Sequence, residues 1–133
     1  MRYRRGASAE RELIHELEAR GFAVVRSAGS KKVDVVAGNG KLYLCIEVKS
    51  TRGKKVYLKA EDLEKLLSFS ARFGCVPVVA VKFVGHGWRF FMGERIKERA
   101  GGGKTYPVGK GDPGVSLETI IGVQRDLEEV LRG

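Results

Sequence analysis

The sequence predicts an α/β fold in which a small mixed central β-sheet is flanked by helices, within one domain that spans residues 1–133. Segments with apolar residues at helical spacing alternate with short apolar runs typical of strands, in the order helix, strand, hairpin, helix, strand, strand, helix. Hydrophobic residues make up 43% of the chain and charged residues 31%, which is the balance of a folded globular protein. A chain of 133 residues is long enough to bury one core.

The first predicted helix covers residues 8–20, and Gly21 stands where a helix-ending glycine belongs. A short strand over residues 22–26 and a polar loop over residues 27–32 follow. Ser8 is a candidate N-cap of this helix. Its apolar stripe consists of Leu13, Ile14 and Leu17.

The next stretch, VDVVAGNGKLYLCIEVKS (residues 33–50), predicts a β-hairpin, because Asn-Gly is the strongest short hairpin signal. If Asn39-Gly40 is a two-residue turn, Gly38 faces Lys41 and Asp34 faces Cys45. Alternate side chains share a face of a strand. One face then collects only apolar residues: Val33, Val35, Ala37, Leu42, Leu44, Ile46 and Val48. The other face collects all four charged residues of the stretch together with three uncharged ones: Asp34, Val36, Lys41, Tyr43, Cys45, Glu47 and Lys49.

The second half of the chain predicts one more helix, two more strands and a closing helix. Residues 94–114 are rich in Gly and Lys and predict a mobile loop. The expected elements are a basic loop at 51–57, a helix at 60–73 ending at Gly74, strands at 76–84 and 88–92, and a helix from Leu117, weakened at Gly122, with the apolar residues Ile120, Ile121, Leu127, Val130 and Leu131.

The charged face of the hairpin suggests a metal site. Asp34 and Glu47 are diagonal neighbours, about 7–8 Å apart at the backbone. Two like charges at that distance oppose each other's ionisation unless a cation lies between them. Oxygen ligands suit Mg²⁺ or Mn²⁺. Lys49, one pleat beyond Glu47, could orient a water or stabilise charge that develops on a phosphate.

The alternative is an ordinary solvated face with a cross-strand ion pair. Three features favour the metal site. Val36, Tyr43 and Cys45 would half cover the face, and the chain is strongly basic. Glu10 lies on the apolar stripe of the first helix, where it is either a dipole partner of the first turn or a third acid of the site. The resulting hypothesis is a metal site that cuts phosphodiester bonds.

The whole-chain composition bounds the partners. A net charge of +9 and a pI near 9.8 favour a polyanionic partner. The sequence contains no run of about 18 apolar residues, which a membrane helix would need. The basic start is not followed by the apolar run of a signal peptide, so we expect a cytoplasmic protein. Cys45 and Cys75 have no metal-type spacing, and we expect two buried free thiols rather than a disulfide.

Asp34, followed at a distance by Glu47-Val48-Lys49, resembles the PD…(D/E)xK signature of a nuclease superfamily, with Val33 in place of the proline. The surrounding stretches are similar to the archaeal Holliday junction resolvase family over residues 2–93 and about 114–131, whereas residues 94–112 match least. The stretches that carry the similarity are GASAERELIHELEARGFAVVRSAGSKKVDVVAGNG, LCIEVKS, VPVVAVKF, GWRFF and GVSLE.

This resemblance implies a restriction-endonuclease-like nuclease core in a homodimeric, Mg²⁺-dependent archaeal endonuclease, with Mn²⁺ able to substitute and no small-molecule cofactor. Such an enzyme recognises four-way DNA junctions by shape and introduces paired symmetric nicks. Among the matching positions, the metal-ligand acids are Glu10, Asp34 and Glu47, the catalytic lysine is Lys49, a catalytically important serine is Ser30, and basic positions near the scissile strand are Arg11 and Arg26.

Two further surfaces fit this interpretation. Phe69 and Phe73 lie four residues apart on the second helix, about 90° from its leucine stripe. They either extend the core or form a dimer contact, and we predict the dimer contact. The other surface is basic and flanks the ends of the hairpin. Its predicted phosphate contacts are Arg2, Arg4, Arg5, Arg11, Arg26, Lys31, Lys32, Arg52, Lys54, Lys55 and Lys82.

Two other functions remain as alternatives. One is a related nuclease for other branched or flapped DNA, which needs the same residues for hydrolysis. The other is a non-catalytic DNA-binding subunit built on the same fold. A degenerate copy would be expected to lack Asp34, Glu47 or Lys49, and the chain has all three.

Overall fold

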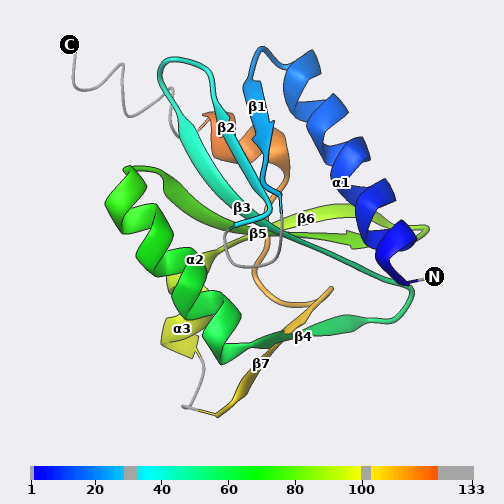
Figure 1. The fold of residues 1–133 in the computed structure, drawn as a ribbon. Helices are drawn as coiled ribbons and strands as arrows, with labels where there is room; N and C mark the ends of the chain where they lie inside the picture. Colours follow the sequence, from blue (N-terminus) through cyan, green and yellow to red (C-terminus); the bar gives the residue numbers. More distant parts are fainter. Residues whose placement is uncertain (1, 29–32, 100–102, 123–133) are drawn as a thin grey trace.

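The computed structural model describes residues 2–28, 33–99 and 103–122, with side chains from Ala7 onward, and its centre is a five-stranded sheet (Figure 1). The strand order is β1-β2-β3-β5-β6, and all neighbours are antiparallel except β3 and β5, which are parallel. The predicted mixed sheet with flanking helices is therefore confirmed. The strands are β1 (Ala23–Arg26), β2 (Val35–Gly38), β3 (Tyr43–Thr51), β5 (Val76–Phe83) and β6 (Gly87–Met92).

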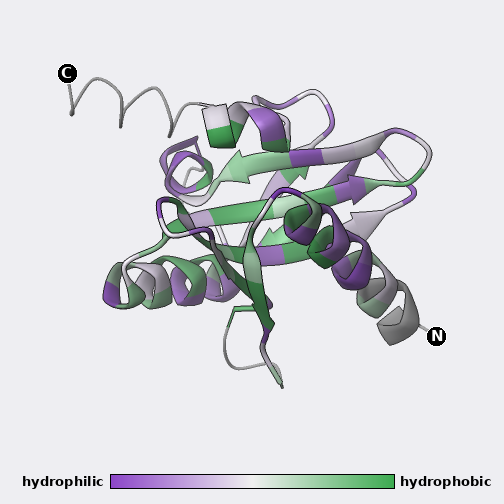
Figure 2. Ribbon diagram, turned by 90° about the horizontal axis from the view of Figure 1, so that it is seen from above, coloured by the Kyte–Doolittle hydropathy of each residue, from purple (hydrophilic) through white to green (hydrophobic). Residues whose placement is uncertain are grey.

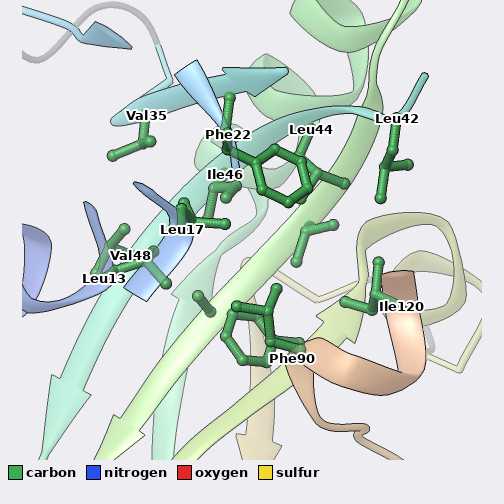
Figure 3. Close-up of a cluster of buried hydrophobic side chains, with 14 of the residues drawn as sticks. Leu13, Leu17, Phe22, Val35, Leu42, Leu44, Ile46, Val48, Phe90 and Ile120 are labelled. Carbon is green, nitrogen blue, oxygen red and sulfur yellow. The ribbon is translucent and has the colours of Figure 1, made fainter. Parts of the chain in front are cut away.

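Two hydrophobic clusters cover the two faces of this sheet. The helix α1 (Arg2–Ala19) packs on one face through Leu13 and Leu17, around residues that Figure 3 labels. The helix α2 (Ala60–Phe73) packs on the other face through Leu63 and Leu66. In Figure 2 both helices carry alternating hydrophobic and hydrophilic residues, as expected for helices with one buried side. Gly74 ends α2 in a left-handed conformation, as predicted.

The turn of the hairpin differs from the predicted one by one residue. The backbone N–H of Asn39 donates to the carbonyl of Leu42, and the side-chain oxygen of Asn39 accepts the N–H groups of Lys41 and Leu42. Gly40, with a φ of 90°, and Lys41 therefore form the turn. Moving a two-residue turn by one residue shifts the strand register by two, so every side chain of the paired strands keeps its predicted face. Val33, before the strand, packs with the α2 cluster instead.

Two predicted loops contain regular structure. Residues 94–114 hold most of α3 (Gly93–Arg99) and the strand β7 (Thr105–Gly109), and the predicted loop at 51–57 overlaps β4 (Lys55–Lys59). β4 and β7 pair as a separate antiparallel ribbon. The prediction of loops was wrong because each segment has few buried apolar residues among many Lys, Arg and Gly residues, which left the periodicity weak. The buried residues are Ile96 on α3, and Leu58, Tyr106 and Val108 on the ribbon.

The prediction of two free thiols was also wrong, because Cys45 and Cys75 form a disulfide. Cys45 lies on β3, Cys75 directly precedes β5, and the two strands are neighbours. Their Cα atoms are 5.8 Å apart, within the usual range for a disulfide. The sequence argument had relied on the expected compartment and could not foresee this register.

The chain after β7 returns to the α1 side of the sheet. Val115 forms a bridge with Phe90 on β6, and Leu117 and Ile120 enter the α1 cluster. Residues 117–122 are helical, which agrees with the start of the predicted closing helix, whereas its apolar residues Leu127, Val130 and Leu131 lie outside the described residues. Among the described residues, no helix is long and apolar enough to span a membrane.

Candidate active site

The candidate site is centred on an acid in the middle of the sheet. Glu47 lies on β3, on the face that α2 covers, and is only 6% exposed. Asp34 directly precedes β2, whose first residue Val35 pairs with Ile46. Continuing this register by one residue sets Asp34 opposite Glu47 rather than diagonal to it, and the charge of Asp34 acts on Glu47. The two acids predicted to converge are therefore neighbours.

The backbone of β3 holds Asp34 in place. The N–H of Val48 donates to Oδ2 of Asp34 over 2.8 Å, and the carbonyl of Asp34 accepts the N–H of Ser27 over 3.0 Å. The carboxylate thus bonds to the strand residue next to Glu47. This contact fixes the separation of the two acids by backbone geometry rather than by flexible side chains.

Burial and mutual repulsion dominate the electrostatics of the site. Burial raises the pKa of Glu47 to about 7, Asp34 adds to the rise, and Lys49 opposes it. The pKa of Asp34 is also raised, first by burial, against the hydrogen bond from Val48. Nζ of Lys49 lies 3.5 Å from Oε2 of Glu47, close enough to offset part of its charge. Two acids with raised pKa values form a place where a cation is favoured.

Glu10 lies near this pair but has a cationic partner of its own. Nε of Arg26 donates to Oε1 of Glu10 over 2.7 Å. The charge of Glu10 contributes to the raised pKa of Asp34. Together with Ser27, these three residues line an open cavity of about 440 Å³. Glu10, predicted as a metal ligand, and Arg26, predicted to act near the scissile strand, therefore meet on one side of Asp34.

The donor set suits a hard divalent cation, since Asp34 and Glu47 offer carboxylate oxygens in a partly desolvated setting. Within the described ranges, no group of three or more His, Cys, Asp or Glu side chains lies close enough to hold a metal ion. The arrangement thus supplies two facing acids. Glu10 uses Oε1 for Arg26 and would have to bring its other oxygen, Oε2, toward the pair to become a third ligand.

Two residues of α2 that the sequence analysis did not select also reach the site electrostatically. The charge of Asp62 contributes to the raised pKa of Glu47, and Lys65 lowers the pKa values of both acids. Asp62 and Lys65 form an ion pair over 3.8 Å, one helical turn apart. The sequence held one signal for this position: Asp62 and Lys65 are polar, three residues apart, and each directly precedes a buried leucine, Leu63 or Leu66. This spacing places both at the border of the helix face that covers β3.

Apart from Arg26, which pairs with Glu10, the predicted basic contacts fall into three groups. Arg11, Arg52, Lys54 and Lys55 are exposed. Lys82 forms an ion pair with Glu12, an acid that also accepts the indole N–H of Trp88, so Lys82 is partly occupied within the protein. The third group lies outside the described residues or side chains: Arg2, Arg4, Arg5, Lys31 and Lys32. The predicted catalytic serine, Ser30, also lies outside the described residues.

The two predicted interface phenylalanines differ in burial. Their rings stack with centroids 5.4 Å apart. Phe69 packs partly against the α2 cluster, whereas Phe73 is 58% exposed. Phe69 therefore extends the core, and Phe73 leaves an apolar surface next to it. The dimer contact itself stays a prediction.

The raised pKa of Glu47 predicts a pH-dependent stability in the presence of a chelator. Between pH 4.5 and about 7 the folded state binds a proton that the unfolded state releases, so the free energy of unfolding falls as pH rises through this window. Glu47→Gln removes this dependence. We expect the free energy of unfolding of Glu47→Gln, relative to that of the native chain, to increase by on the order of 3 kcal/mol between pH 4.5 and pH 8.

Chemical denaturation at the two pH values checks this prediction. Glu64→Gln is the matched control, because Glu64 is an exposed acid of α2 that pairs with Lys97 of α3. A stability difference between the native chain and Glu47→Gln that is the same at both pH values would contradict the assignment.

The sequence of this chain is similar to one protein family and to several known enzymes. The model of the family described as archaeal Holliday junction resolvase (Hjc) matches residues 1–129. The crossover junction endodeoxyribonuclease Hjc of Methanocaldococcus jannaschii is 45% identical over 108 residues, which cover 72% of this chain and 81% of that protein. The enzyme of the same name from Archaeoglobus fulgidus is 44% identical over 92 residues, which cover 65% and 68%.

A solved structure agrees with the sequence matches. The structure of Archaeoglobus fulgidus Hjc, a Holliday junction resolvase, superposes with a TM-score of 0.80 at 35% identity. The match covers 89% of this chain and 96% of that one. A third relative, the crossover junction endodeoxyribonuclease Hje of Saccharolobus solfataricus, is 38% identical over 101 residues, which cover 70% and 75% of the two chains.

Proposed function

The chain belongs to the archaeal Holliday junction resolvase family, and from that membership we propose that it cuts four-way DNA junctions by Mg²⁺-dependent hydrolysis at Asp34, Glu47 and Lys49. The crossover junction endodeoxyribonuclease activity itself follows from the family. The observation that carries the assignment of the site is the buried Glu47 opposite Asp34 in a chain of net charge +9.

Asp34 and Glu47 would hold the metal ion, with Mn²⁺ able to replace Mg²⁺, and Glu10 would be the third acid through Oε2, the oxygen that Arg26 does not contact. When bound, such an ion polarises a phosphodiester and lowers the pKa of a coordinated water. The hydrogen bond from Val48 keeps Asp34 aimed at the site. A phosphate of the scissile strand offers Arg26 an alternative anionic partner, which supports a role for Arg26 as a phosphate contact.

Lys49 would act on the reacting phosphate rather than on the fold. Its ammonium is 3.5 Å from Glu47, and its side chain is one-third exposed, so it borders the solvent that a substrate would displace. A cation at that point stabilises negative charge that develops on the phosphate oxygens. The proposed role of Ser30 rests on the family resemblance alone, because Ser30 lies outside the described residues.

Paired symmetric nicks call for two sites, and we propose that the working form is a homodimer. The exposed ring of Phe73, stacked on Phe69, supports a contact on the outer face of α2. The described part of one chain holds one such pair of site acids, Asp34 and Glu47, so a single copy could cut one strand at a time. Two copies related by a twofold axis would present two equivalent sites to a junction whose arms are themselves related by symmetry.

The proposed function predicts how junction binding depends on salt and on competitor DNA. Affinity should fall steeply with salt, because Lys and Arg contacts to phosphates release counterions. The preference for a junction over linear duplex should persist at every salt concentration, because branched shape rather than charge sets the selectivity.

Competition in a gel-shift or fluorescence assay checks this, with a junction and a linear duplex of the same sequences and a chelator to prevent cleavage. We expect the junction complex to survive a large excess of duplex. Loss of the complex at equal concentrations of duplex would contradict recognition by shape.

A further inference from the structure

The ribbon of β4 and β7 is a paired element that stands apart from the central sheet. Figure 1 shows the two strands side by side beneath the sheet, next to the start of α2. The pairing runs from Lys55 opposite Gly109 to Lys59 opposite Thr105. One face of the ribbon is anchored in the α2 cluster. The residues that anchor it are Val56, Leu58, Tyr106 and Val108.

The opposite face of the ribbon is exposed and carries only positive charge. Lys55, Tyr57 and Lys59 alternate along β4 on this face, and Tyr57 is 64% exposed. Their partners across the ribbon are Gly109, Pro107 and Thr105, so no acid belongs to the face. Within the part of the chain that the structure describes, Lys55 and Lys59 have no ion-pair or hydrogen-bond partner for their ammonium groups.

The spacing of this face matches one strand of duplex DNA. Lys55 and Lys59 are four residues apart on an extended strand, which separates their Cα atoms by about 13–14 Å. Successive phosphates of one DNA strand rise about 3.4 Å along the helix axis but also wind around it, so they lie farther apart than this rise, and the two ammonium groups can reach phosphates about two nucleotides apart. Tyr57 lies between them, where its hydroxyl can donate to an intervening phosphate and its ring can pack on a sugar.

A second copy of the chain fits this face poorly. A symmetric contact through it would set lysines against the same lysines of the partner, which like-charge repulsion disfavours. A DNA backbone supplies the complementary charge along the whole row. A DNA backbone can also bind to a surface without a pocket, such as the exposed face of this two-stranded ribbon.

We propose that the exposed face of the β4–β7 ribbon binds the phosphate backbone of a duplex arm of the junction, outside the catalytic centre. This inference rests on the proposed function, since a junction supplies the arm. Contacts of this kind are independent of sequence and add affinity without reading bases. The exposed Lys54 extends the positive charge at the end of the ribbon where Lys55 lies, and the exposed Lys104 extends it at the end where Lys59 lies.

The test is the salt dependence of junction binding for the double variant Lys55→Gln/Lys59→Gln, measured on the full chain in chelator. Loss of two phosphate contacts should lower the slope of log K against log salt concentration by about 1.8. Tyr57→Ala should weaken binding severalfold and leave the slope unchanged. All three side chains are exposed, so the variants are expected to fold.

The matched control is Lys41→Gln/Arg95→Gln, which removes two exposed charges from the hairpin turn and from α3. An unchanged slope in the ribbon variant, or an equal decrease in the control, would overturn the proposal. So would a change in the oligomeric state of Tyr57→Ala, which would indicate a protein contact. Cleavage of a junction by the native chain is measured in parallel, and its absence would overturn the proposed function instead.

Discussion

Asp34→Asn and Glu47→Gln should each reduce junction cleavage by about two orders of magnitude or more while junction binding remains close to that of the native chain. Each substitution removes a carboxylate charge that would hold the metal ion but keeps the size of the side chain. Neither removes a cation that could contact DNA. In Asp34→Asn the amide oxygen of the new side chain can still accept the N–H of Val48, so the hairpin should keep its geometry.

Single-turnover cleavage with saturating enzyme and Mg²⁺ checks this prediction, with binding measured separately in chelator. Glu64→Gln serves as the control, because it removes an exposed acid of α2 that pairs with Lys97 of α3. Calorimetric titration with Mg²⁺ in the absence of DNA adds an independent readout, in which both site variants should lose the binding heat. Native turnover by either variant would show that the acids serve the fold and not the reaction.

The double variant Phe69→Ala/Phe73→Ala should sediment as a folded monomer at micromolar concentration and lose the resolution of junctions into duplex pairs. Buried Phe→Ala changes cost about 3–5 kcal/mol each in well-packed settings, and a small homodimer has little surplus stability to absorb such a loss. Phe69 also packs on the α2 cluster, so part of its effect falls on the monomer.

Phe73→Ala alone separates the two effects. Phe73 is largely exposed in the single chain, so its removal should weaken the dimer and leave the unfolding of the monomer nearly unchanged. Tyr43→Ala is the control, because it removes another exposed aromatic ring, on β3. If the double variant stays dimeric with normal activity, the dimer contact lies elsewhere on the surface.

The sequence predicted the hairpin chemistry better than the hairpin geometry. The alternation of apolar and charged residues assigned Asp34, Glu47 and Lys49 to one face, and the structure brings them together there. The turn was placed one residue too early, because the side chain of Asn39 caps the turn instead of forming part of it. The alternation of side chains repeats every two residues, so it is the same before and after a register shift of two and cannot distinguish the two registers.

Other features depended on tertiary contacts that no local pattern encodes. The disulfide required β3 and β5 to be parallel neighbours, and the ion pair of Glu10 with Arg26 required α1 to lie beside β1. The ribbon escaped prediction because its exposed face is rich in lysine and its paired strands lie far apart in the sequence, with Lys59 opposite Thr105. Its buried face becomes apparent only when β4 and β7 are aligned.

The most direct measurement of the central claim is cleavage of a synthetic four-way junction beside linear duplexes of the same sequences, with Mg²⁺ and the native chain. The account predicts that the junction is cut in two strands of like polarity at symmetric positions, that the products are nicked duplexes, and that the linear duplexes stay intact. Equal cleavage of junction and duplex, or cleavage of flapped DNA in preference to the junction, would contradict it.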